Sequence, residues 1–250
     1  MKKLRALIFD VDGTLADTEK DGHRVAFNLA FAESGLDWDW SSELYGDLLS
    51  VAGGKERISF YLQKYLPEFV IPHDSFIADL HATKTKHYRD LLAQGKIPLR
   101  PGVKRLILEA RSQGVRLAIA TTSALPNAIA LLEKTLDPAW FEVIAAGDIV
   151  PAKKPAPDIY HYVIKEMNLQ PQDCLVLEDS LHGMQAAVAA GLPTIVTVND
   201  YTKNQNFAEA LLVLNHLGEP ELPLTVLAGD VLDGTHLNLE MLYRLHSSLL

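Results

Sequence analysis

The sequence predicts an α/β protein: a doubly wound, Rossmann-like parallel sheet with a small helical bundle inserted after its first strand. Three observations lead to this fold class. Short, nearly continuous apolar runs are typical of strands buried on both faces, helical patterns lie between these runs, and one long stretch near the N-terminus is helical throughout. At 250 residues, with 48% hydrophobic and 22% charged residues, the chain has an ordinary globular composition and suffices for one large domain or two smaller ones.

The five predicted strands share apolar and β-branched side chains with little alternation of polarity. They are ALIFDV, VRLAIATTS, FEVIAAGD, CLVLEDS and PTIVTVND, which begin at residues 6, 115, 141, 174 and 193. A strand covered by helices on both faces is expected to show this pattern, whereas a half-exposed strand would alternate.

Helical spacing of apolar residues fills the intervals between these strands. It occurs in residues 102–113, 126–136 and 157–168, and the run LHGMQAAVAAG ends at Gly191, which suits a helix C-cap. Strands that alternate with helices predict right-handed crossover connections and therefore a parallel sheet.

One stretch interrupts the alternation. It contains GHRVAFNLAFAESGL, KERISFYLQKYL and DSFIADLHATKTKHYRDLLAQ, all with helical spacing and without a clear buried strand. We therefore expect a core domain of residues 1–15 and 96–250, and a helical insert of residues 16–95. Near the C-terminus, ALLVLNHLG and LTVLAGD fit peripheral strands and helix ends equally well.

Composition also limits which partners the protein can bind and where in the cell it can act. The net charge of -9 argues against nonspecific binding to nucleic acid or to an anionic membrane, since both need clustered Lys and Arg. No apolar run approaches the roughly 20 residues of a membrane helix, and Asp10 breaks the apolar start that a signal peptide would need. The single cysteine, Cys174, is expected to be a core residue. We expect a monomeric cytoplasmic protein with a small-molecule ligand, or a protein of the plastid stroma if a leader has been removed.

Polar side chains follow four of the predicted strands at their carboxyl ends, where an open parallel sheet binds its ligands. They are Asp10 and Asp12, then Thr121, Thr122 and Ser123, then Lys154 in the loop after the third strand, and Glu178 with Asp179. Carboxylates brought together repel unless a cation neutralises them, and an all-oxygen set suits Mg²⁺. Hydroxyl groups, loop N–H groups and the lysine would then bind the oxygens of a phosphoryl group.

The first of these motifs, DVDGT, suggests covalent chemistry. Asp10 can act as a nucleophile that forms an aspartyl-phosphate, and Asp12 can act as general acid and base, because residues two apart in an extended chain point the same way. Gly13 allows the chain to turn sharply after the strand, and Thr14 can hydrogen-bond in that turn. The tetrapeptide Asp-x-Asp-Gly alone would also fit a plain turn or a Ca²⁺ loop. A second Asp-Gly-Thr, at 233–235, has no partner motif, and we interpret it as an ordinary turn.

Together the motifs DVDGT, IATTS, KKPAPDIY and LEDSLHG resemble, in order, those of the haloacid dehalogenase superfamily of aspartate-nucleophile phosphatases, over residues 1 to about 200. The resemblance implies that Asp10 is the nucleophile and Asp12 the acid and base. It implies further roles in phosphoryl binding for Thr121 and Lys154, and a Mg²⁺ site of Asp10, the Asp12 carbonyl, Glu178 and Asp179. A carboxylate at Asp12 favours phosphatases over dehalogenases. The insert resembles the small cap of the family, which closes over the site and excludes water.

Within that superfamily, the stretches DTEKDGHRVAFNLAFAESGLDWDW, LYGDLLSVAGGKERISFYL and HATKTKHYRDLL are similar to the CbbY branch. This resemblance implies hydrolysis of xylulose 1,5-bisphosphate, an inhibitory by-product of Rubisco in carbon-fixing organisms. A basic set beside a flexible glycine pair predicts a second phosphate site in the cap, formed by Gly53, Gly54, Lys55, Arg57 and Lys84. The alternative for these cations is a solvated helix face. Asp17 either binds a sugar hydroxyl or caps the next helix.

Two other functions remain open. A β-phosphoglucomutase-like isomerase would use the same residues and return the phosphoryl group to the other end of a bisphosphate intermediate. Relatives with that activity often have Val where this chain has Thr14, so Thr14 favours hydrolysis. A non-catalytic binding protein on this fold would be expected to lack at least one of the four reactive residues Asp10, Asp12, Lys154 and Asp179, yet all are present.

Overall fold

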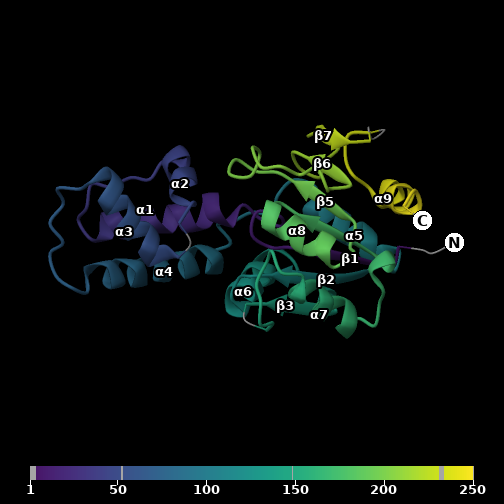
Figure 1. Cartoon of the computed structure of the whole chain (residues 1–250), viewed down its shortest axis with the longest axis horizontal. Coiled ribbons are helices and arrows are strands. Elements are labelled where there is room, and N and C mark those ends of the chain that lie inside the picture. The colour runs from purple at the N-terminus through teal and green to yellow at the C-terminus, as the bar shows by residue number, and fades with distance from the viewer. Residues whose placement is uncertain (1–3, 52, 148, 231–233, 250) are drawn as a thin grey trace. The chain divides into compact units, whose positions relative to one another are not determined.

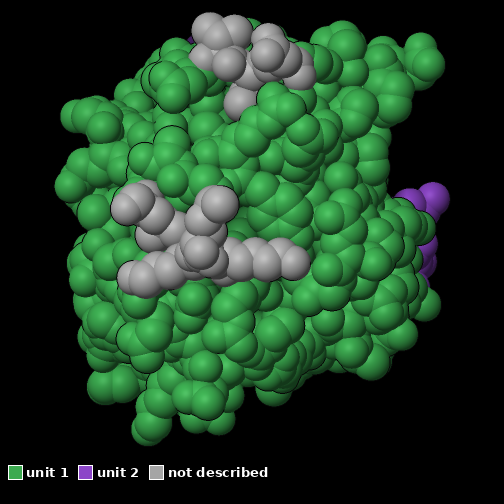
Figure 2. Space-filling model, turned by 90° about the vertical axis from the view of Figure 1, so that its right-hand side faces the viewer, with its two compact units in different colours: residues 1–17, 98–250 green, residues 18–97 purple. Residues whose placement is uncertain are grey.

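The computed structural model of the chain describes residues 4–51, 53–147, 149–230 and 234–249. The predicted turn at 233–235 begins outside these described residues. The chain divides into two compact units, which Figure 2 colours separately: a core unit of residues 1–17 and 98–250, and a helical unit of residues 18–97. The boundaries expected from the sequence lie two residues earlier, after residues 15 and 95.

The core unit is built on one sheet in which seven strands run in the order β3-β2-β1-β4-β5-β6-β7 within the described residues. The strands are β1 (Ala6–Phe9), β2 (Arg116–Thr121), β3 (Val143–Ala146), β4 (Cys174–Glu178), β5 (Thr194–Thr197), β6 (Leu212–Leu214) and β7 (Val226–Gly229). Pairing is parallel from β3 to β6, and β7 pairs with β6 in antiparallel orientation. Figure 1 labels all of these strands except β4, with β3 low and β7 high in the core unit. The doubly wound fold is thus confirmed.

The winding reverses at the centre of the sheet. From β1 the chain adds β2 and then β3 on one side, and it later adds β4, β5 and β6 on the other side. Such a reversal creates a crevice beyond the carboxyl ends of the strands on either side of it. The residues that follow β1 and β4 therefore lie where an α/β protein binds its ligand.

Helices cover the sheet on both faces. They are α5 (Val103–Ser112), α6 (Leu125–Thr135), α7 (Asp158–Glu166), α8 (Leu181–Ala189) and α9 (Leu239–Ser247), with short 3-10 turns η2 (Pro138–Trp140) and η3 (Pro171–Asp173). Helices α7 and α8 pack in one apolar cluster with Ala6 and Ile8 of β1, and Leu7 and Phe9 point to the opposite face. The predicted cap at Gly191 is present, with φ +75° and a hydrogen bond from the Leu192 N–H to the Ala187 carbonyl.

The helical unit contains the π-helical turn η1 (Thr18–His23), which continues into α1 (Arg24–Glu33), and then α2 (Ser42–Leu48), α3 (Gly54–Tyr65) and α4 (Phe76–Ala93). Helices α1 and α4 pack along each other. Aromatic rings fill the interior, with Trp40 and Phe27 4.6 Å apart between centroids and Trp38 edge-on to Phe31. Among the described residues, none of the helices has the length and apolar character that crossing a membrane would require.

Within the core unit, the two points where the chain leaves and re-enters are joined. Ala16 and Leu99 form an antiparallel bridge, and the Arg100 N–H donates to the Leu15 carbonyl at 2.8 Å. The segment just before the helical unit and the segment just after it therefore form one short piece of paired backbone.

Candidate active site

Three carboxylates meet at the carboxyl edge of the sheet. Asp10 directly follows β1, Glu178 ends β4, and Asp179 comes next; one oxygen from each lies within 4.8 Å of the other two. The register brings them together, because Phe9 is paired with Leu177 and the Asp10 N–H donates to the Leu177 carbonyl at 3.0 Å. All three residues are buried. The acidic cluster predicted from the strand ends is therefore present.

Lys154 is the cation of this cluster. Its Nζ donates to Asp10 Oδ1 at 2.6 Å, to Glu178 Oε1 at 2.5 Å and to the Ala120 carbonyl at 2.9 Å, and its side chain is 6% exposed. Burial lowers the pKa of Lys154, but Asp10 and Glu178 outweigh this effect and raise the pKa overall. The lysine is therefore held charged between two carboxylates.

The pKa values of two of these carboxyl groups are raised, because burial and the neighbouring carboxylates disfavour their charged forms. Burial raises the pKa of Asp10 to about 8 although Lys154 lowers it, and Glu178 and Asp12 raise it further. The pKa of Asp179 is raised as well, chiefly by burial and then by Asp10 and Glu178. Arg100 and Lys154 lower the pKa of Asp179 but do not outweigh these effects, so an additional cation would stabilise the charged forms of the carboxylates. The buried, all-oxygen donor set fits a hard divalent metal ion.

Asp12 lies outside that cluster and is held by the loop after β2. Ser123 Oγ donates to Asp12 Oδ2, and Thr121 Oγ1 donates to the same oxygen at 3.4 Å. The Ser123 N–H in turn donates to Thr121 Oγ1 at 3.1 Å. Thr122 is exposed, and in the described residues no hydrogen bond joins it to this group. The structure thus places the predicted residues Asp12, Thr121 and Ser123 together and leaves Thr122 apart.

Two glycines leave space for the carboxylates. Gly13 has φ +90°, and a Cβ there would overlap Asp179 Oδ2; a Cβ on Gly183 would overlap the Glu178 carboxylate. Thr14 hydrogen-bonds in this turn through its backbone, since its N–H donates to the Val11 carbonyl at 3.3 Å, whereas its buried hydroxyl has no partner among the described residues. Further backbone bonds close the turn, from the Gly13 N–H to the Ala16 carbonyl at 2.8 Å and from the Leu15 N–H to the Val11 carbonyl at 2.9 Å.

Sequence reasoning did not find three residues that support the site. Tyr160 donates from its hydroxyl to Glu178 Oε1 at 2.5 Å, and Asn199 Nδ2 donates to Asp179 Oδ2 at 2.8 Å. Arg100 is buried and donates to the Gly13 carbonyl. Asn199 lies just after β5, and Tyr160 ends the motif KKPAPDIY, so both positions were usable signals; for Arg100 the sequence offered none.

Asp17 has a partner that was not predicted. Its Oδ1 lies 3.3 Å from Arg100 Nε, and the Asp17 side chain is 30% exposed. Both residues belong to the core unit. A sugar-binding role for Asp17 stays a prediction.

The helical unit has a polar network of its own. Lys84 Nζ lies 2.7 Å from His23 Nδ1 and above the rings of Phe27 and Tyr88, at 4.9 and 5.2 Å from their centroids. Burial lowers the pKa of Lys84 to about 8. With only 7% of its surface exposed, Lys84 does not belong to a solvated helix face, and that alternative is wrong for it.

Arg57 is the second buried cation of the helical unit and is 8% exposed, so the solvated-face alternative is wrong for it too. Its Nη1 donates to the Tyr45 hydroxyl at 2.7 Å, and that hydroxyl donates to Glu19 Oε2 at 2.6 Å. Lys55, by contrast, is exposed, which agrees with the alternative of a solvated helix face. Gly53 has φ +91° and precedes α3, which starts at Gly54.

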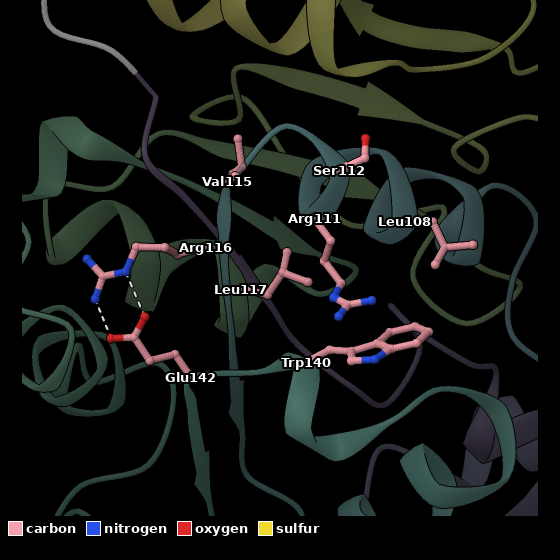
Figure 3. A pocket seen from close by; sticks show the side chains of 9 residues that line it. Leu108, Arg111, Ser112, Val115, Arg116, Leu117, Trp140 and Glu142 are labelled. Carbon is pink, nitrogen blue, oxygen red and sulfur yellow. Dashed lines mark hydrogen bonds and ion pairs between the residues drawn. The ribbon is translucent and has the colours of Figure 1, made fainter.

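A pocket of about 470 Å³ lies elsewhere on the core unit (Figure 3). It is lined by Leu108, Arg111, Ser112, Gly114, Val115, Arg116, Leu117, Trp140 and Glu142. Figure 3 shows the Arg111 guanidinium over the Trp140 ring, 4.2 Å from its centroid, and Arg116 paired with Glu142. The pocket is at the start of β2, the opposite end of the strand from the acidic cluster, so it is not part of the candidate active site.

Comparison with known proteins identifies the family. A family model described as haloacid dehalogenase-like hydrolase matches residues 4–191, which include every strand up to β4 and the whole acidic cluster. The chain belongs to the haloacid dehalogenase-like hydrolases. The predicted membership is thus confirmed.

Within the haloacid dehalogenase-like hydrolases, this chain is a CbbY-like phosphatase. It is 49% identical over 226 residues to the plasmid protein CbbY of Cupriavidus necator, covering 88% of this chain and 89% of the relative. Crystal structures of CbbY from Rhodobacter sphaeroides, one in complex with phosphate and one of a mutant in complex with xylulose-(1,5)bisphosphate, are 46% identical, with TM-scores of 0.71 and 0.70. Each match covers 85% of this chain and 94% of the CbbY chain.

Proposed function

We propose that this phosphatase hydrolyses xylulose 1,5-bisphosphate to xylulose 5-phosphate with Mg²⁺, through an aspartyl-phosphate on Asp10. The observation that carries the proposal is the convergence of Asp10, Lys154, Glu178 and Asp179 at one sheet edge. The substrate is supported by the relative crystallised with xylulose-(1,5)bisphosphate at 46% identity.

Asp10 and Asp12 divide the chemistry between them. The Asp10 carboxylate attacks the phosphorus atom, while Lys154, next to it, binds and neutralises a phosphoryl oxygen. Asp12, which accepts hydrogen bonds from Ser123 and Thr121, delivers a proton to the leaving sugar oxygen. The Asp12 carboxylate then takes a proton from the water that hydrolyses the aspartyl-phosphate.

The residues that would hold Mg²⁺ are Asp10, Glu178 and Asp179, with the Asp12 carbonyl. When bound, the ion supplies positive charge that offsets the charge of the phosphoryl group. The fit rests on the oxygen-only donor set, on its burial, and on the space that Gly13 leaves beside Asp179.

The non-reacting phosphate requires cations of its own. We assign it to the helical unit, where Lys84 and Arg57 are buried cations, and Lys55 adds an exposed charge next to Gly53 and Gly54. Arg57 is shared with Glu19 and Tyr45, and Lys84 with His23, so the network can redistribute its hydrogen bonds when an anion arrives.

The mutase remains the second candidate function, because a β-phosphoglucomutase would need the same core residues. The deciding experiment measures phosphate release with Mg²⁺ from xylulose 1,5-bisphosphate, ribulose 1,5-bisphosphate and β-glucose 1-phosphate, and assays glucose 6-phosphate from the last. We expect release from the xylulose compound and little from its ribulose epimer. Glucose 6-phosphate without free phosphate would identify a mutase instead. The monomeric state and the cytoplasmic location stay predictions.

A further inference from the structure

We propose that Tyr160 is a positioning residue of the metal site: its hydroxyl fixes the Glu178 carboxylate in the orientation that binds the divalent ion and holds Lys154. The inference rests on the proposed metal-dependent function. Tyr160 belongs to none of the catalytic or substrate-binding residues predicted from the sequence.

Two buried donors contact the same oxygen of Glu178. The Tyr160 hydroxyl and Lys154 Nζ both donate to Glu178 Oε1, each at 2.5 Å. The other oxygen, Oε2, accepts the Asp179 N–H at 3.2 Å. Lys154 Nζ also lies 5.3 Å from the centroid of the Tyr160 ring. Tyr160 therefore contacts both groups whose relative position decides how the cluster binds cations.

Burial makes this hydrogen bond consequential. Tyr160 is fully buried and Glu178 is 1% exposed, so water does not take over a lost hydrogen bond at this carboxylate. On its other side Glu178 lies directly against the backbone of Gly183, where even a Cβ would overlap it. The carboxylate is thus enclosed between a phenol, an ammonium group and a helix backbone.

The chain segment explains why the phenol and the lysine act together. Lys154 lies in the loop that leads to α7, and Tyr160 lies in the first turn of that helix, with its N–H donating to the Pro157 carbonyl at 3.0 Å. The tyrosine packs in the apolar cluster of α7, α8 and the sheet. It therefore anchors to the sheet the segment that carries Lys154. Partners of metal ligands commonly set ligand orientation in this way.

The test compares Tyr160→Phe with Tyr162→Phe. Phenylalanine keeps the ring in place and removes only the hydroxyl. Tyr162 lies on the same helix, and no hydrogen bond of its hydroxyl occurs within the described part of the chain. Mg²⁺ affinity is measured by calorimetry on metal-stripped protein, and the melting temperature is measured in a chelator. The Mg²⁺ dependence of phosphate release is measured separately.

We expect Tyr160→Phe to weaken Mg²⁺ binding by ~10- to 100-fold. The KM for substrate at saturating Mg²⁺ should stay close to that of the wild type, and Tyr162→Phe should match the wild type throughout. Unchanged Mg²⁺ affinity in Tyr160→Phe overturns the inference, and a lower melting temperature alone would assign Tyr160 a merely structural role. If the inference fails but the wild-type enzyme still requires Mg²⁺ for phosphate release, the proposed function is retained. A wild type that neither binds Mg²⁺ nor releases phosphate overturns both.

Discussion

Single side chains in this protein carry buried charge at two separate places. In the core unit, Lys154 lies between Asp10 and Glu178; in the helical unit, Lys84 lies against His23 and two aromatic rings. The environments act in opposite directions. Carboxylates raise the pKa of Lys154, whereas burial lowers the pKa of Lys84 to about 8. Lys154 is thereby fixed in the charged form, and Lys84 is able to change its charge near neutral pH.

Asp10→Asn removes the nucleophile while keeping the size of the side chain. We expect kcat for phosphate release to fall by on the order of 10³-fold or more, because an amide does not form the aspartyl-phosphate. Circular dichroism should show an unchanged fold. Full activity in this variant would refute the covalent mechanism.

The lowered pKa of Lys84 predicts a pH effect on substrate binding. Its ammonium group is charged below a pKa of about 8 and neutral above it, so KM for the bisphosphate should rise from about pH 7 to about pH 9. The stability effect has the opposite sense. Burial of the charged form is unfavourable below pH 8, and the unfolded pKa is 10.5, so unfolding free energy should rise with pH between these values.

Lys84→Arg is the matched variant for both measurements, because arginine keeps its charge throughout this range. Initial rates across a pH series give KM, and chemical denaturation at each pH gives the unfolding free energy. A pH profile of KM in Lys84→Arg that matches the wild type would show that Lys84 does not bind the second phosphate.

At the level of elements, the ends of strands and the starts of helices build the site. Strands β1 and β4 deliver the carboxylates, and α8 begins directly after them, with Ser180 accepting the Gly183 N–H at 3.2 Å. Gly183 lies early in α8, where Ala would be the better helix former by about 1 kcal/mol. The neighbouring Glu178 carboxylate explains why a glycine lies here, because a Cβ would overlap it.

Gly183→Ala should therefore lower activity by more than any loss of stability explains. The added Cβ must displace the Glu178 carboxylate, so we expect phosphate release at fixed Mg²⁺ to fall ~10-fold or more. The melting temperature should fall as well, because the displaced carboxylate loses buried hydrogen bonds and better helix propensity offsets only part of that cost. Gln185→Ala, at an exposed position of the same helix, is the control for a neutral substitution. Equal activity in the two variants would contradict the role assigned to the glycine.

The sequence predicted elements well where burial is continuous. All five apolar runs form strands, because both faces of the central sheet are covered. Strands β6 and β7 stayed ambiguous because β6 has only three residues and β7 is mostly exposed, so neither shows a long, continuously buried apolar run. Helix α2 was not predicted; it has only seven residues and includes Gly46. Asp10 and Glu178 were predictable from strand ends, whereas the hydrogen bond of Tyr160 to Glu178 depends on helix packing, although Tyr160 ends the motif KKPAPDIY.

Across the whole core unit, Arg100 connects segments that are distant in the sequence. Its guanidinium donates to the carbonyl of Gly13 beside the candidate active site, to that of Thr197 at 2.8 Å, and to those of Val198 and Asn215 at 2.5 and 2.9 Å. The loops after β1, β5 and β6 thus share one buried cation. No local stretch of sequence predicts such a contact set.

Arg100→Ala should destabilise the fold as a unit. Removing the guanidinium leaves several buried carbonyls and the Asp17 carboxylate without this partner, so we expect a loss of about 3–5 kcal/mol in unfolding free energy by urea denaturation. Arg105→Ala is the comparison, because Arg105 is more exposed and pairs with Glu219 and Glu109, and its loss should cost about 1 kcal/mol. A similar loss in both variants would show that Arg100 is an ordinary surface-like arginine.

The bridge between Ala16 and Leu99 joins the two points where the chain leaves and re-enters the core unit. We therefore expect that residues 18–97 can be replaced with a turn or with another helical segment without changing the sheet or its carboxylates. Because we assign the second phosphate to the helical unit, we expect grafting another helical unit to change substrate choice while the core unit keeps the proposed phosphoryl chemistry.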